Sequence, residues 1–145
     1  MRYIGFDLGT KTLGVSVSDN LGLIASAYKT IRFNENDYES LLKEVENVLK
    51  EFNTNIIVLG LPKNMNNTLG DAANRSLNFK KLLEDNFDVK VIMQDERLSS
   101  VEANNIMISG GVTRKKRKKS VDSLAANIIL QSYLDKRKED NNEYR

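Results

Sequence analysis

Residues 3–11 read Tyr3-Ile4-Gly5-Phe6-Asp7-Leu8-Gly9-Thr10-Lys11, and Asp7 closes the hydrophobic run that opens this stretch. The run has the length of a strand, and the glycine and threonine after it indicate a tight turn. An acid in that place rarely serves a core, whereas such turns commonly position a metal ion or a phosphate. Asp7 could also simply accept a hydrogen bond from the Gly9 or Thr10 amide. Its partners elsewhere in the chain therefore decide its role.

Two further strand-like segments follow this run. In residues 12–18, Leu13, Val15 and Val17 alternate with smaller or polar residues, as expected of a strand. A turn at residues 19–22 leads to a third segment around residues 23–33. The short links predict an antiparallel meander.

From residue 36 onward, the pattern alternates between helix and strand. Asn36 or Asp37 is a candidate cap for a first helix, and an apolar run at 56–61 predicts a buried strand that Pro62 ends. Alternation of this kind calls for parallel strands, so we expect an α/β fold with a mixed five-stranded sheet and helices on both faces. The remaining predicted elements are a helix with Ala72, Phe79, Leu82 and Leu83 on one face, a strand at 89–93, a helix from about 99 that Gly110-Gly111 breaks, and a last helix over about 120–138.

Length and composition limit the chemistry. A chain of 145 residues fits one domain, which we place at residues 1–138, with 139–145 as a disordered tail. The chain has no Cys and no His, which excludes disulfide scaffolds, Cys/His zinc sites and His-activated nucleophiles. Any bound metal must have oxygen ligands, which favours Mg²⁺, Mn²⁺ or Ca²⁺.

Neither a signal peptide nor a membrane span is predicted. The longest apolar stretch, residues 56–61, is far shorter than the roughly 18 residues that a span requires. The absence of Cys fits a reducing compartment. We therefore expect a soluble cytoplasmic protein without a membrane partner.

The positive charge is concentrated in one run. The formal net charge is +2, and six cations follow one another, so the rest of the chain sums to −4. Such a run can be a solvated loop, but it directly precedes the predicted helix that carries Asp122, where it could hold a nucleic acid backbone. Six phosphate contacts would make binding fall steeply with salt, with a slope near −0.9 per contact on duplex DNA. The run consists of Arg114, Lys115, Lys116, Arg117, Lys118 and Lys119.

Two further acidic segments could join Asp7. Asp95-Glu96-Arg97-Leu98 follows a predicted strand, and ligands usually bind at the carboxyl ends of strands in such sheets. Asp122 lies in line with Ala125, Ala126, Ile129 and Tyr133, beside the apolar stripe of the last helix. An acid that faces a sheet needs a partner, and a metal ion shared with Asp7 would supply one. The acids of both segments could instead stabilise the N-terminus of a helix through its dipole, or form ion pairs.

A polar loop after the 56–61 strand offers further contacts. Lys63 and the amides from Asn64 onward could meet phosphate, sugar or bases, although a plain surface loop has the same composition.

Together these blocks resemble the YqgF family, small bacterial proteins described as Holliday-junction resolvases or as nucleases that mature the precursor of the small-subunit ribosomal RNA. The resemblance spans nearly the whole chain, in order. One departure is visible, because Asn67 stands where the family tends to have Gly. The matching blocks are residues 5–19, 60–65, 95–100, 121–126 and 129–134.

The resemblance implies a ribonuclease H-like fold, with acidic site residues at Asp7, Glu96 and Asp122. These three would hold one or two Mg²⁺ (or Mn²⁺) ions, which in two-metal sites lie roughly 3.5–4 Å apart, and Asp95 could be a fourth ligand. The residues expected to bind the nucleic acid are Lys11, Lys63, Asn64, Arg97 and the run 114–119. The expected activity is metal-dependent hydrolysis of phosphodiester bonds in structured RNA or branched DNA, with maturation of the 5′ end of precursor small-subunit rRNA favoured.

Three alternatives stay open. A Holliday-junction resolvase in DNA recombination would act as a symmetric homodimer. A non-catalytic nucleic-acid-binding module would use the acids only in caps and turns. The sequence Asp-Leu-Gly-Thr also resembles the first phosphate loop of the actin, Hsp70 and sugar-kinase superfamily, but those proteins need a second domain that 145 residues cannot supply.

Overall fold

The computed structural model describes residues 2–62, 70–95 and 114–143, and within these ranges the side chains of 114–122 and 138–143 are not described. The strands are β1 (Ile4–Leu8), β2 (Thr12–Ser18), β3 (Ala25–Arg32), β4 (Ile56–Leu61) and β5 (Lys90–Asp95). The described helices are α1 (Tyr38–Phe52), α2 (Asp71–Asn86) and α4 (Arg114–Glu143).

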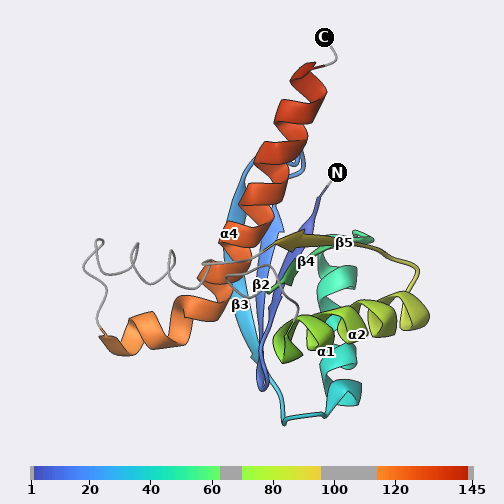
Figure 1. The fold of residues 1–145 in the computed structure, drawn as a ribbon, viewed down its shortest axis with the longest axis vertical. Helices are drawn as coiled ribbons and strands as arrows, with labels where there is room; N and C mark the ends of the chain where they lie inside the picture. The colour runs from blue at the N-terminus through green and yellow to red at the C-terminus, as the bar shows by residue number, and fades with distance from the viewer. Residues whose placement is uncertain (1, 63–69, 96–113, 144–145) are drawn as a thin grey trace.

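All five strands form one mixed sheet in the order β3-β2-β1-β4-β5 (Figure 1). β1 pairs antiparallel with β2, and β2 pairs antiparallel with β3, which confirms the predicted meander. β4 pairs parallel with both β1 and β5, as the alternation of strand and helix predicted. β1 is therefore the central strand, and its carboxyl end lies at the same edge of the sheet as those of β4 and β5.

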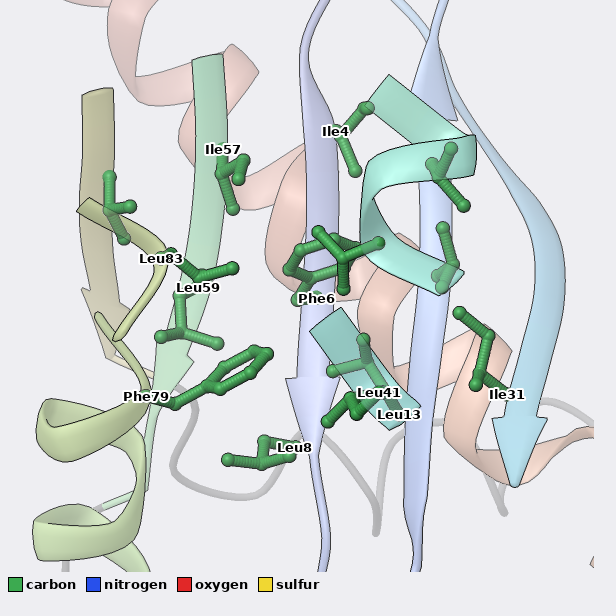
Figure 2. Packing of buried hydrophobic residues seen from close by; sticks show 14 of the residues in the cluster. Ile4, Phe6, Leu8, Leu13, Ile31, Leu41, Ile57, Leu59, Phe79 and Leu83 are labelled. Carbon is green, nitrogen blue, oxygen red and sulfur yellow. The ribbon is translucent and has the colours of Figure 1, made fainter. Parts of the chain in front are cut away.

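Each face of the sheet has its own helical cover. Ile4, Phe6 and Leu8 of β1 pack with α1 and α2, in a core that also includes Leu41 of α1 and Phe79 of α2 (Figure 2). On the opposite face, Ile129, Leu130 and Leu134 of α4 pack against Tyr3, Ala25 and Val58. Helices on both faces confirm the predicted architecture, and the period of two along β1 assigns each of its residues to one face.

Local signals explain how α1 begins and ends. Its N-cap is Asp37, whose carboxylate accepts a hydrogen bond from the Ser40 amide (3.4 Å), as one of the two predicted caps. At the C-terminal end, Asn53 adopts the left-handed conformation, and its amide donates to the Leu49 and Lys50 carbonyls.

Three details of the predicted elements are wrong. On α2, Ala73 faces the core and Ala72 is exposed, because the buried row follows steps of three and four residues through Ser76, Phe79 and Leu83. β5 extends to Asp95, two residues beyond its predicted end.

The third correction concerns α4, which begins at Arg114 and not near Ser120. It also continues to Glu143, five residues beyond its predicted end at about residue 138. Neither Gly nor Pro occurs between residues 112 and 143, and Lys, Arg and Glu are good helix formers, so nothing local stops the helix at either predicted boundary. In the described parts of the chain, no helix is both long enough and apolar enough to span a membrane.

The turn between β2 and β3 anchors the carboxyl-terminal half of α4. Gln131 accepts a hydrogen bond from the Ala25 amide (2.8 Å) and donates to the Leu23 carbonyl (3.1 Å). Arg137 donates to the carbonyl of Gly22 (3.2 Å), which has the positive φ of 69° that favours glycine. These bonds fix α4 along the sheet at the end away from its first turns.

Asp19 organises this turn from within. Its carboxylate accepts hydrogen bonds from the amides of Leu23 (2.7 Å) and Ile24 (3.1 Å). These two backbone donors, Leu23 first, hold the pKa of Asp19 below its ordinary value.

Replacing Asp19 by Asn is expected to lower the free energy of unfolding at neutral pH. The folded-state pKa lies below that of the unfolded chain, so the charge stabilises the fold above about pH 4 and this contribution is lost as pH falls through the folded-state pKa. The difference between Asp19→Asn and the parent chain should therefore shrink on acidification, as measured by urea unfolding at several pH values. Asp85→Asn, at an exposed position of α2, is the control. A difference independent of pH would contradict the role given to the charge.

Candidate metal and nucleic-acid site

Asp7 lies within β1, opposite Gly14 of β2, and the strand continues through Leu8. The prediction that Asp7 stands where the sheet stops is therefore off by one residue. The turn comes next, where the Gly9 amide donates to the Thr12 carbonyl (2.8 Å). Asp7 is half-buried, because its place in the central strand leaves only the edge of the sheet open to solvent.

Alternation along β1 places Asp7 on the face that α4 covers. Ile4, Phe6 and Leu8 belong to the core beneath α1 and α2, so Gly5 and Asp7 point to the other side. A Cβ atom at Gly5 would lie 2.8 Å from Leu130 Cβ and 3.0 Å from the Ala126 carbonyl oxygen, which confirms that this face meets α4.

A buried hydrogen bond fixes α4 at the same point. The Ser16 hydroxyl on β2 donates to the Ala126 carbonyl of α4 (2.9 Å), and Ser16 pairs with Gly5 in the sheet. Both Ser16 and Ala126 are fully buried. The helix backbone thus rests directly on β1 and β2, with a glycine beneath it and a serine holding it.

α4 runs antiparallel to β1. The Tyr133 ring lies 5.8 Å from the Tyr3 ring, and the Arg137 guanidinium stands 5.2 Å above Tyr3, near the start of the strand. Ala126 and Leu130 meet Gly5 further along. Moving toward the first residues of α4 therefore means moving toward the carboxyl end of β1, where Asp7 lies (Figure 1).

Asp122 precedes Ala126 by one helical turn, about 6 Å along the axis. Asp7 follows Gly5 by two residues, about 6.7 Å along β1 in the same direction. The row predicted to face the sheet together with Asp122 is buried at Ala125, Ala126 and Ile129. The first turns of α4, orange in Figure 1, bend away from the line of the rest of the helix. Asp7 and the backbone of Asp122 are therefore each displaced from the contact at Gly5 by about 6–7 Å along their own elements.

Asp95 lies on the face of the sheet that α1 and α2 cover, whereas Asp7 lies on the α4 face. Asp95 is the last residue of β5 and pairs with Leu61 of β4. Along β5, Val91 and Met93 pack into the core on the α1 and α2 side, and Asp95 shares their face. This alternation argues against Asp95 as a ligand of an ion beside Asp7.

Of the other predicted site residues, some lie in the described part of the chain and some do not. Lys11 is exposed just after β1, and its carbonyl accepts a hydrogen bond from the Phe33 amide (2.9 Å), which ties the turn to the end of β3. The backbone of the basic run 114–119 forms the first turns of α4. Lys63, Asn64, Glu96 and Arg97 lie outside the described residues.

A hard divalent cation suits the donor set that is in place. Asp7 offers carboxylate oxygens, which Mg²⁺ and Mn²⁺ prefer, and it pairs with Gly14, which has no side chain to compete for space beside it. Among the described residues, no three acidic side chains gather closely enough to hold a metal ion. The side chain of Asp122 and the whole of Glu96 do not belong to the described part of the structure.

Two residues essential to this geometry were not singled out by sequence reasoning. Gly5 and Ser16 stand in the block that resembles the family, but nothing in their local pattern shows that they face each other across two strands. A glycine and a serine at buried positions of adjacent strands are a signal of close backbone approach only once the register is known.

Replacing Gly5 by Ala is expected to destabilise the fold by about 1–3 kcal/mol, because the new methyl group would displace Ser16 and the α4 backbone. Urea unfolding measures the effect, and Ser132→Ala on the exposed side of α4 is the control. Unchanged stability in Gly5→Ala would contradict the close contact of helix and sheet.

Comparison with known proteins identifies the family of this chain. The family model RuvX, described as Holliday junction resolvase, matches residues 1–136. The chain belongs to the RuvX (YqgF) family. Membership confirms the expectation of a nuclease, a hydrolase of phosphodiester bonds.

Curated relatives in the RuvX family are similar over nearly their full length. A Geobacillus protein (strain WCH70) is 50% identical over 135 residues, which are 93% of this chain and 98% of the relative. A Bacillus subtilis protein is 45% identical, with the same coverage of both chains. Both carry the name "Putative pre-16S rRNA nuclease".

Solved resolvase structures share the fold. RuvC from T. thermophilus in complex with a Holliday junction superposes with a TM-score of 0.59 at 17% identity, covering 96% of each chain. The Fowlpox virus resolvase with its junction DNA has a TM-score of 0.56 at 17% identity, covering 94% of this chain and 98% of that one. These likenesses confirm the ribonuclease H-like fold.

Proposed function

We propose that this protein is a metal-dependent endonuclease for structured nucleic acid, with Asp7, Glu96 and Asp122 as the ligands of one or two Mg²⁺ (or Mn²⁺) ions. The observation that carries the proposal is the position of Asp7. It is a half-buried carboxylate in the central strand, on the face where α4 meets the sheet, at the end toward which Asp122 lies.

Electrostatics supports a shared cation. Carboxylates brought together at one sheet edge repel one another, and a divalent ion between them converts this repulsion into attraction. The chain has no His, so the side chain that most often moves protons in hydrolysis is absent. A bound ion would supply an activated water molecule and stabilise the charge on the leaving oxygen.

The cationic residues hold the substrate in this proposal. Six consecutive Lys and Arg residues form the first turns of α4, in the sequence that leads to Asp122. Cations at a helix N-terminus oppose the helix dipole and repel one another, and phosphate groups of a bound nucleic acid would relieve both effects. Lys11, Lys63, Asn64 and Arg97 would add contacts around Asp7.

Precursor small-subunit rRNA is the favoured substrate. The relatives that are 45–50% identical over nearly the whole chain carry the name of a pre-16S rRNA nuclease, and this substrate would place the protein in the cytoplasm. Junction DNA is the second candidate, favoured by the family description. A resolvase would cut a symmetric junction as a homodimer, whereas processing of one RNA end requires one active site.

The Asp7→Asn variant should lose more than about 100-fold in cleavage rate and keep its fold. Removing second-sphere partners of a metal typically costs 10–100-fold, so loss of a direct ligand should cost at least as much. The assay measures Mg²⁺-dependent cleavage, with circular dichroism as the check on folding. Asp85→Asn on the exposed surface of α2 should cleave at the parent rate. Full activity in Asp7→Asn would refute the ligand assignment.

Substrate choice is tested by parallel cleavage of an RNA that carries the precursor 5′ extension and of a four-way DNA junction. Faster, site-specific cleavage of the RNA is expected. Faster, symmetric cutting of the junction, together with a dimeric mass in solution, would favour the resolvase. Tight binding without cleavage in any divalent metal would favour a non-catalytic module.

A further inference from the structure

Ser16 makes a contact that its place in the fold does not require. It lies in the middle of β2 and is fully buried, and its hydroxyl donates to the Ala126 carbonyl of α4 at 2.9 Å. A buried hydroxyl needs a partner, but an alanine at this position would need none. The serine therefore adds a cost that the bond to α4 must offset.

The helix does not depend on this bond for its own hydrogen bonding. In an α-helix, the Ala126 carbonyl is the acceptor for the amide four residues later, and a carbonyl oxygen has a second lone pair free for Ser16. The Ser16 bond is thus an additional link between helix and sheet. What it determines is the distance and rotation of α4 at this point.

Gly5 completes the contact from the adjacent strand. Its missing side chain lets α4 approach until the Ala126 carbonyl and Leu130 lie directly above β1. Glycine removes the steric limit on approach, and the Ser16 hydroxyl supplies a directional attraction. We call the three residues Gly5, Ser16 and Ala126 the helix seat.

We propose that Ser16 is a positioning residue for the metal site, because the helix seat fixes α4 on the sheet close to both acids, which lie on the same side of it. Asp7 is two residues from Gly5 along β1, and Asp122 is one turn from Ala126 along α4. A shift of α4 at the seat moves one carboxylate relative to the other. This inference rests on the proposed function, in which both acids bind the same ion or ion pair.

Ser18 provides a matched comparison on the same strand and the same face. It is also buried, its hydroxyl accepts a hydrogen bond from the Tyr3 amide (2.8 Å), and it donates to the Asp19 carbonyl (3.0 Å). These two partners belong to the sheet and its turn and not to α4. Removing the Ser18 hydroxyl therefore weakens the fold without loosening the helix seat.

The test compares Ser16→Ala with Ser18→Ala in the full chain. Both should lose stability, but Ser16→Ala alone should raise, by about tenfold, the Mg²⁺ concentration for half-maximal cleavage, as is typical when support for a metal ligand is removed. KM for the nucleic acid should stay unchanged. A second readout needs no cleavage: the Mn²⁺ concentration that gives half of the maximal rise in Tm should shift by a similar factor in Ser16→Ala only.

The outcomes separate the two claims. If the parent chain responds to metal in both readouts and the two serine variants respond alike, the positioning role is refuted and the nuclease proposal stands. If the parent chain shows neither metal-dependent cleavage nor a metal-dependent rise in Tm, both claims fail. A selective shift in Ser16→Ala supports the positioning role.

Discussion

The contact of α4 with β1 and β2 is the constraint on which the candidate site depends. A helix backbone can rest this closely on a sheet only where the strand beneath it lacks a side chain, and Gly5 meets that requirement. Ser16 then holds the helix through the Ala126 carbonyl. Because α4 joins the sheet from more than 100 residues away in the chain, this contact brings the end of the sequence to its beginning. The acids at positions 7 and 122 share one region of the molecule for that reason.

Much of the fold could be predicted from sequence, because its signals are local. Alternating residues such as Leu13 and Val15 indicate a strand, and Asp37 is a recognisable helix cap. The order of strands and helices then restricts the sheet to a meander joined to parallel strands. The bounds of α4 were missed because a run of charged residues shows no periodic spacing of apolar side chains. Its helical state follows instead from the helix propensity of Lys and Arg and from the absence of Gly and Pro.

The candidate site was less accessible to sequence reasoning. Asp7 could be singled out because an acid in a buried strand is unusual, but its face depends on the alternation of the whole strand. Asp95 illustrates the limit, since it stands beside Glu96 in sequence, and only the extension of β5 to Asp95 shows that it shares a face with Val91 and Met93. The roles of Gly5 and Ser16 follow from a pairing between strands that no local pattern encodes.

The central claim is that Asp7 and Asp122 bind the same metal site, and a crystal structure grown with Mn²⁺ tests it most directly. Anomalous scattering from manganese locates the ion independently of the atomic model. We predict a peak at about 2–2.2 Å from a carboxylate oxygen of Asp7, with an oxygen of Asp122 bound to the same ion or to a second ion about 4 Å away. Manganese bound elsewhere, or bound by Asp7 with Asp122 beyond reach of the ions, would contradict the account.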